Sequence, residues 1–275
     1  MMLSVPLDWK AHMSLFSRTA ASIALGVLLV SPSLALAADT VEMADMTWVE
    51  VRGAIERGMT TAIVPSGGIE QNGPHMVLGK HDYIVRANAN RIAQALGNAL
   101  VAPVISYVPE GDYTPPTGNM LYPGTLGLPE PVFAGVLEGI ARSLKNTGFK
   151  TISLIGDHGG NQAAQALVAA KLNREWAGQA KVLNVTDYYI DEAQMKFLRG
   201  GGETDATIGS HAGLIDTAEL MSVHPQGVDL AKFKSYARKE APGHSGDPAR
   251  ASPELGKALL DIRINAAIKQ IKAAN

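Results

Sequence analysis

The sequence contains no cysteine, and this absence excludes several kinds of chemistry at once. A chain without cysteine has no disulfide framework, no thiolate ligand for a metal ion and no cysteine nucleophile. Any metal ion must therefore be held by imidazole, carboxylate, amide oxygen or water.

An excess of positive charge is also missing. The 24 lysine and arginine residues are balanced by 26 aspartate and glutamate residues, and no basic stripe runs along the chain. This balance argues against nucleic acid as a partner. The apolar content of 46% over 275 residues is enough for one large core, so we expect a globular protein.

The N-terminal stretch has the three-part layout of a secretory signal peptide. An apolar run over residues 20–30 follows Lys10 and Arg18 and precedes the small-residue triplet at 35–37. The run is about half of the roughly 20 apolar residues that a membrane-spanning helix needs. We therefore expect residues 1–37 to be a signal peptide rather than a membrane anchor.

Cleavage of that peptide before Ala38 leaves residues 38–275, in which we find no repeat, low-complexity tract or linker and expect one domain. The mature protein is then expected in the periplasm or outside the cell, with no membrane attachment. Either Met1 or Met13 can be the true start, because both keep the same layout.

Strand and helix patterns alternate along the mature chain. Short apolar, partly β-branched runs predict buried strands at 61–64, 151–155 and 181–185. Apolar residues recur at helical spacing over 133–144, 164–176 and 255–266. Gly148, Asn161 and Ser252 are suited to cap these helices. The alternation predicts an α/β fold with a mostly parallel sheet covered by helices on both faces.

Side chains that can bind metal follow two of the predicted strands and recur in a later turn. The three clusters are Glu70, Asn72, His75, His81 and Asp82; then Asp157 and His158; and then His211, Asp216 and Glu219. Loops at the carboxyl ends of parallel strands meet at one edge of the sheet. A single histidine in a turn is more often an ordinary surface or hydrogen-bonded residue, but three such turns together favour a divalent metal site.

Imidazole and carboxylate ligands suit Zn²⁺, Mn²⁺ or Fe²⁺, and an open site of this kind activates water for hydrolysis. His211 has the chemistry of a general acid or base. Gly160 and Asn161 begin a predicted helix, whose free N–H groups can bind a substrate carboxylate or oxyanion. The alternative for these two residues is an ordinary helix cap.

Four segments resemble the creatininase (creatinine amidohydrolase) family. They are Glu-Gln-Asn-Gly-Pro-His at 70–75, Tyr-Pro-Gly-Thr at 122–125, Asp-His-Gly-Gly-Asn at 157–161 and His-Ala-Gly at 211–213. The resemblance extends over residues 61–266 in the right order. It implies a three-layer αβα sandwich, a metal site, hydrolysis of non-peptide C–N bonds in small and often cyclic amides, and a hexameric assembly.

The resemblance also assigns roles to individual residues. Glu70 and His158 match metal ligands of the family, and His211 matches the histidine that moves protons. We expect Glu70 and His211 to be catalytic.

The chain departs from the family at three positions. Asn72 stands where the family has histidine, His81 where it has a metal-bridging aspartate, and Asp216 where it has glutamate. The expected ligands are Glu70, His81, His158 and Asp216, with Asn72 and Asp82 as further candidates. A neutral imidazole cannot bridge two ions, so we expect one tightly bound ion and a second that is loose or absent. If Asp82 takes the bridging place instead, two ions of similar affinity are expected.

Two main functions remain open from the sequence, and a sugar or phosphate hydrolase is a further alternative, because only the family resemblance points to amides. The first is an exported metal-dependent amidohydrolase that acts on a small molecule. The second is a periplasmic protein of the same fold that binds a small ligand or metal without catalysis. Acidic residues at Glu70 and Asp216 favour the enzyme, because both keep metal-binding chemistry.

Overall fold

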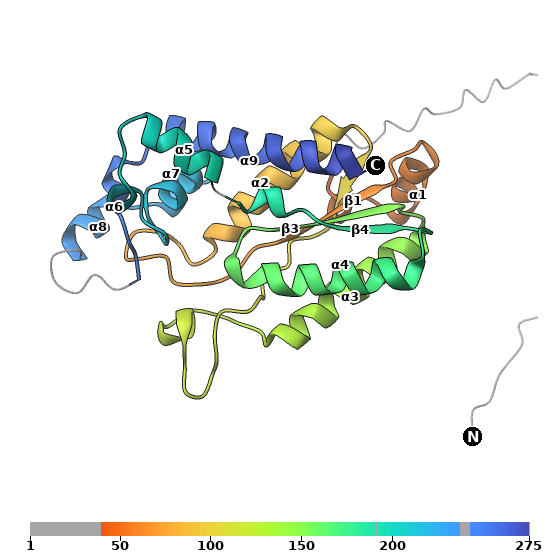
Figure 1. Cartoon of the computed structure of the whole chain (residues 1–275), viewed down its shortest axis with the longest axis horizontal. Coiled ribbons are helices and arrows are strands. Elements are labelled where there is room, and N and C mark those ends of the chain that lie inside the picture. Colours follow the sequence, from red (N-terminus) through yellow and green to blue (C-terminus); the bar gives the residue numbers. More distant parts are fainter. Residues whose placement is uncertain (1–39, 191, 237–242, 275) are drawn as a thin grey trace, which may run out of the picture. The chain divides into compact units, whose positions relative to one another are not determined.

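The structure is a computed structural model that describes residues 40–190, 192–236 and 243–274 (Figure 1). These residues belong to one compact unit, Ala37–Asn275. The predicted signal peptide over 1–37 lies outside the described residues. Within the described ranges, no helix is both long enough and apolar enough to cross a membrane.

Four parallel strands form the sheet, in the order β2-β1-β3-β4. Their bounds are β1 Thr61–Ser66, β2 Ala99–Val101, β3 Thr151–Gly156 and β4 Lys181–Asn184. The three strands predicted from apolar runs are confirmed. β1 and β3 are buried along their whole length and lie side by side at the centre, paired from Thr61 with Thr151 to Ser66 with Gly156. Their carboxyl ends therefore finish at the same level.

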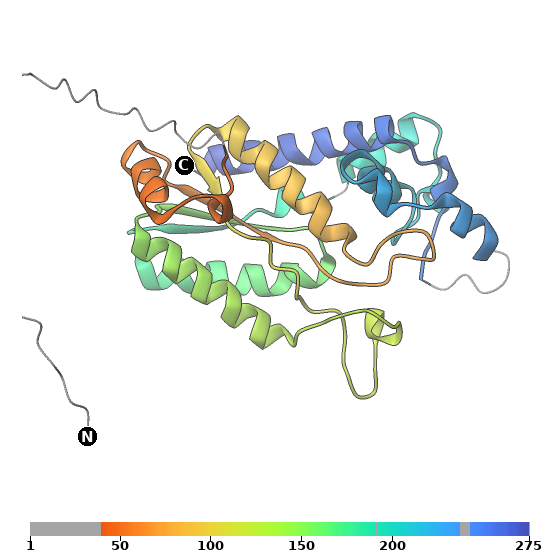
Figure 2. The same cartoon turned by 180° about the vertical axis from the view of Figure 1, so that it is seen from behind.

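Two layers of helices enclose this sheet, as Figures 1 and 2 show. α3 (Glu130–Thr147) and α4 (Gln162–Trp176) cover one face, and α2 (Lys80–Leu96) and α9 (Pro253–Ala274) cover the other. Side chains alternate along each strand, so Ala62 and Val64 pack with the first pair of helices while Ile63 packs with the second. The predicted three-layer αβα sandwich is confirmed.

Helix ends follow the predicted capping residues in two of three cases. Gly148 takes a left-handed conformation (φ 114°) at the end of α3, as a C-terminal glycine does. The hydroxyl of Ser252 accepts a hydrogen bond from the N–H of Leu255 (3.1 Å) at the start of α9. Asn161 precedes α4 but makes no side-chain cap there.

The described part of the chain also has shorter helices and several 3-10 turns. The shorter α-helices are α1 (Trp48–Glu56), α5 (Glu192–Gly200), α6 (Asp205–Ile208), α7 (Leu214–Val223) and α8 (Leu230–Tyr236), and one of the 3-10 turns is η2 (Gly118–Leu121). α7 packs along α9 through a small apolar cluster that includes Leu214, Ala218 and Leu259. This contact brings the segment around His211 and Asp216 beside the carboxyl edge of the sheet.

Candidate metal site

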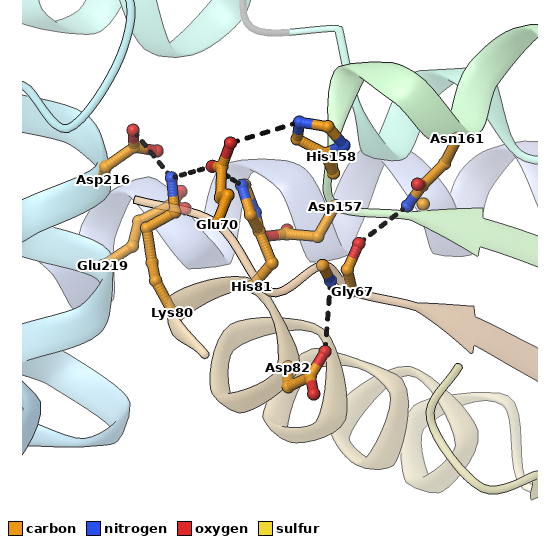
Figure 3. Close-up of polar contacts among 12 residues, drawn as sticks. Gly67, Glu70, Lys80, His81, Asp82, Asp157, His158, Asn161, Asp216 and Glu219 are labelled. Atoms are coloured by element: carbon orange, nitrogen blue, oxygen red, sulfur yellow. Dashed lines mark hydrogen bonds and ion pairs between the residues drawn. The ribbon is translucent and has the colours of Figure 1, made fainter. Parts of the chain in front are cut away.

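Three side chains that can bind a metal ion converge beyond the carboxyl ends of β1 and β3 (Figure 3). They are Glu70, His81 and His158, and one ligand atom from each lies within 4.8 Å of the other two. Glu70 follows β1, His158 follows β3, and His81 lies in the first turn of α2. The parallel pairing of β1 and β3 brings these three segments together.

The loop that carries Glu70 is held by its own polar groups and by α2. The Nδ2 atom of Asn72 donates hydrogen bonds to the backbone oxygens of Glu70 (3.0 Å) and Val77 (3.1 Å). At the start of the loop, Gly67 packs so closely on Asp82 that a Cβ atom there would collide with the carboxylate. The position of Glu70 is therefore set by the local chain.

His81 lies between two carboxylates. Its Nε2 atom is 2.7 Å from Oε1 of Glu70, and its Nδ1 atom is 2.7 Å from Oδ2 of Asp157. Asp157 in turn accepts a hydrogen bond from the hydroxyl of Tyr188 (2.8 Å) and lies 3.1 Å from the guanidinium of Arg263. A carboxylate behind an imidazole commonly supports a metal-binding histidine, because it fixes the ring and its tautomer.

His158 faces the second oxygen of Glu70. Its Nε2 atom lies 3.4 Å from Oε2 of Glu70 and 3.3 Å from Oε2 of Glu110. Two ligands that each lie about 2.1 Å from an ion in a tetrahedral site are about 3.4 Å apart. The spacing of His158 and Glu70 therefore suits a shared ion.

Glu110, in the loop after β2, brings a further carboxylate to His158. Its side chain is buried, and its Oε1 atom has no hydrogen-bond partner among the described residues. Its Oε2 atom accepts a hydrogen bond from Nδ2 of Asn119 (3.1 Å), which also donates to Oε2 of Glu70. Buried polar atoms rarely remain unpaired, so the carboxylate of Glu110, whose other oxygen lies near His158, is suited to supply a further ligand atom.

The charges around Glu70 favour its ionised form. Burial opposes ionisation, but Lys80 and His81 hold the pKa of the Glu70 carboxyl far below its ordinary value. Burial and Lys80 also favour a neutral His81, yet Glu70 and Asp157 raise the pKa of His81 to about 9. Without an ion, the site at neutral pH therefore holds a carboxylate at Glu70 and an imidazolium at His81. An ion that binds His81 must displace its proton.

The structure places Asp216, a predicted ligand, outside the three-residue cluster. Its carboxylate lies 3.1 Å from Nζ of Lys80 and accepts a hydrogen bond from the N–H of Ala212 (2.7 Å). Lys80 also lies 3.4 Å from Oε1 of Glu70. The ammonium thus pairs with both carboxylates, and the sequence argument gave no role to this lysine.

The two further ligand candidates also point elsewhere. Oδ1 of Asp82 accepts a hydrogen bond from the N–H of Gly68 (3.2 Å), away from the cluster in Figure 3. Successive residues of an α-helix point about 100° apart, so His81 and Asp82 cannot both face Glu70. Asn72 directs its amide nitrogen to the backbone of its own loop. The first turn of α2 therefore presents His81, not Asp82, to the site.

His211 reaches the same site from the turn before α7. It lines a cavity of about 610 Å³ whose wall also includes the three clustered residues. Its Nδ1 atom is 3.9 Å from Oε1 of Glu70, and its Nε2 atom is 3.0 Å from the backbone oxygen of Gln71. The side chain is 31% exposed, so it stays within reach of a molecule in the cavity.

Gly160 and Asn161 were predicted to bind substrate, and in the structure both bind other groups of the protein. The N–H of Gly160 donates to Nδ1 of His158 (3.2 Å), and Nδ2 of Asn161 donates to the backbone oxygens of Ser66 and Gly67 (both 3.1 Å). Neither residue lines the cavity, whereas Gly159 does. Asn161 instead ties the start of α4 to the end of β1. Ion binding at Nε2 of His158 would move the ring proton to Nδ1 and break the Gly160 contact.

Sequence reasoning missed three residues that shape the site, and it did not foresee that Asp157 supports His81. Lys80 stands beside a predicted ligand in the chain, but its charge was given no role. Glu110 and Asn119 lie in the connection between β2 and α3, where no motif singles them out. A carboxylate after a third parallel strand was the available signal for Glu110, but β2 has only three residues and was not predicted.

The fold and the site together define the class of this protein. The fold is a three-layer sandwich, and buried imidazole and carboxylate groups face a cavity at the carboxyl ends of its strands. The protein is a metal-dependent α/β enzyme.

Comparisons with known proteins agree with this class. Residues 44–271 match the family described as Creatininase: creatinine amidohydrolase. The chain is 27% identical to the creatinine amidohydrolase of Pseudomonas putida, over 81% of this chain and 93% of the relative. It is 25% identical to the mycofactocin precursor peptide peptidase of Mycolicibacterium smegmatis, over 76% of this chain and 83% of the relative.

Solved structures show the same similarity. A crystal structure of creatinine amidohydrolase superposes with a TM-score of 0.70 at 25% identity, covering 86% of this chain and 98% of the other. Related creatininase structures include one described as "Zn-Zn type" and one described as "Creatininase Mn". The chain belongs to the creatininase family. This confirms the predicted family, the predicted class of metal-dependent amidohydrolase and the predicted divalent metal cofactor.

Proposed function

We propose that the protein hydrolyses a non-peptide amide bond in a small cyclic or linear molecule with the help of one divalent ion. Glu70, His81 and His158 would hold the ion, and Glu110 would be a further ligand. The observation that carries this proposal is the convergence of the three clustered residues within 4.8 Å at the wall of a cavity. Zinc, manganese and iron all suit such ligands.

The bound ion supplies a Lewis acid and lowers the pKa of water, which is the chemistry that amide hydrolysis needs. The residues of the chain supply the rest. Glu70 holds one negative charge in the wall of the cavity, and Asp157 keeps the ring of His81 in one orientation. In the hydrolysis the acyl carbon gains the oxygen of water, and the leaving nitrogen gains a proton.

His211 is the residue that we propose to carry this proton. It lines the cavity, it is partly exposed, and its Nδ1 atom lies 3.9 Å from Glu70. An imidazole can take a proton from water and return it to a leaving nitrogen in one catalytic cycle. Glu70 and His211 thus remain the proposed catalytic residues.

The size and lining of the cavity support a small substrate. A volume of about 610 Å³ is within the range of pockets for small molecules. Beside the polar cluster, the wall includes Tyr189, Ile190 and Ile215, which offer apolar contact to a ring or short chain. The relative from Pseudomonas putida is named for creatinine, so creatinine is the first substrate to test.

Export, assembly and leader cleavage are further parts of the proposal. The basic, apolar and small-residue layout at 1–37 supports transport out of the cytosol and cleavage before Ala38. Intact mass and N-terminal sequencing of the protein from a periplasmic fraction would test both. A homo-oligomer, by family resemblance a hexamer, is tested by light scattering on the mature chain.

The experiment that decides between enzyme and binding protein starts with metal content. The mature chain, residues 38–275, is purified without added chelator or metal and measured by inductively coupled plasma mass spectrometry. We expect about one zinc, manganese or iron ion per chain and turnover of a small amide. A protein that holds no metal and takes up none would reject the hydrolase. A protein that binds metal but hydrolyses none of a broad amide panel would support the silent binding protein.

A further inference from the structure

Lys80 is a buried cation inside the acidic part of the site. Its side chain is 1% exposed, and its Nζ atom lies 3.4 Å from Oε1 of Glu70 and 3.1 Å from Oδ2 of Asp216. Figure 3 shows the ammonium between these two carboxylates. Lysine is almost never fully buried unless it is paired with a negative charge, and here two carboxylates from separate segments supply that pairing.

The two oxygens of Glu70 are divided between different partners. Oε1 faces Lys80 and His81, whereas Oε2 faces His158 and accepts from Asn119. Of the His, Asp and Glu side chains that the structure describes, only Glu70, His81 and His158 form a three-donor group. Asp216 lies outside this group, and its carboxylate is already paired with Lys80.

One solved relative, a mutant creatininase, is described as "Zn-Zn type", a description that indicates two zinc ions in that protein. We propose that the ammonium of Lys80 replaces a second metal ion in this chain and restricts the site to one ion. This inference rests on the proposed function, because it assumes that the Glu70, His81 and His158 cluster binds metal.

The physical reason is competition for the same carboxylates. A divalent ion beside Asp216 and Oε1 of Glu70 would lie within a few ångströms of Nζ. Lys80 is 1% exposed, and charges of like sign repel more strongly in a buried site than in water, so the ammonium disfavours a divalent ion beside it. The ammonium also has three N–H donors, enough to bind both carboxylates without an ion.

The test is the metal stoichiometry of the full mature chain. Wild type and a Lys80→Met variant are stripped of metal, loaded with excess zinc, desalted and measured by inductively coupled plasma mass spectrometry. We expect one zinc ion per chain in wild type. In Lys80→Met, Glu70 and Asp216 lose their cation, so we expect close to two. Two ions in wild type, or one ion in a folded Lys80→Met variant, would overturn the proposal.

Matched variants separate the role of Lys80 from general effects of the substitution. Lys171→Met makes the same change at an exposed lysine that pairs with Glu138, and it should leave one ion bound. Lys80→Met combined with Asp216→Asn should return the stoichiometry from two to one; retention of two ions there would contradict the proposed place of the second ion.

Two further measurements keep the inference testable if Lys80→Met does not fold, as judged by circular dichroism. Asp216→Asn alone keeps the ammonium and should still bind one zinc ion, whereas loss of that ion would make Asp216 a ligand and overturn the inference. The wild-type stoichiometry itself distinguishes the two proposals. Two ions per wild-type chain would contradict only the proposed role of Lys80 and would leave the proposed function standing. No ion at all would contradict both proposals.

Discussion

Nδ1 of His81 lies 2.7 Å from Oδ2 of Asp157, so the imidazole has a carboxylate directly behind it. Asp157 is itself fixed by Tyr188 and Arg263, which reach it from outside the metal-capable cluster. The imidazole that faces Glu70 thus has a buried carboxylate as its support. The consequences for proton and metal binding can be measured.

Metal affinity is expected to rise with pH up to about 9. Burial and Lys80 favour the neutral ring, but Glu70 and Asp157 raise the pKa of His81 to about 9. An ion must displace this proton, so below pH 9 the dissociation constant should fall about tenfold per pH unit, and above it the curve should flatten. Calorimetry in two buffers of different ionisation enthalpy counts the protons released. A pH-independent affinity between 7 and 9 would show that His81 is not a ligand.

His158→Ala is expected to lose both metal and turnover. The substitution removes the nitrogen that faces Glu70 and Glu110, leaving two buried carboxylates without their shared partner. Metal content and amide hydrolysis are measured on the same preparation. His224→Ala is the matched control, because His224 stacks on Tyr83 and does not line the cavity. Retained activity in His158→Ala would discard the proposed metal site.

His211→Asn should separate catalysis from metal binding. His211 lines the cavity but is not among the clustered ligands, so the metal content should stay at the wild-type value. Loss of a general acid or base typically lowers turnover by about 100- to 10,000-fold. A variant with normal turnover would leave proton transfer to another group.

Arg263→Met is expected to destabilise the fold and weaken metal binding together. Arg263 is buried on α9 and lies 3.1 Å from Asp157 and 2.7 Å from Glu219. Breaking a buried ion pair commonly costs about 3–5 kcal/mol, because the remaining charge is uncompensated. Urea unfolding measures the free energy of unfolding. Arg142→Met, at a partly exposed arginine that pairs with Glu138 and Glu175, should change it less. An equal effect of the two variants would contradict a structural role for the buried network.

The central strands were predictable because their sequences are continuous apolar runs that end in small residues. β2 was not, since three residues carry no periodic pattern. α2 was missed for a local reason: it begins after Gly79, which makes no side-chain cap, so no capping signal marks its start. The segment around His81 therefore looked like an extension of the loop that carries Glu70.

Site residues were predictable where they directly follow a strand in the sequence. Glu70 and His158 come after β1 and β3, and the parallel pairing alone brings their loops together. Lys80 and Glu110 depend instead on contacts across the fold. A lysine in a polar segment usually extends into solvent, and only the approach of Asp216 from α7 makes Lys80 a buried partner. Such burial is a property of the tertiary structure and has no local pattern.

The pairing of β1 with β3 also determines when the three clustered residues can meet. Glu70 and His81 belong to the segment after β1, but His158 follows β3 and is synthesised only after the whole of α3. An ion that all three residues hold would therefore be captured only once the two central strands have joined. The absorbance of Co²⁺ added during refolding would thus report the time at which β1 and β3 pair.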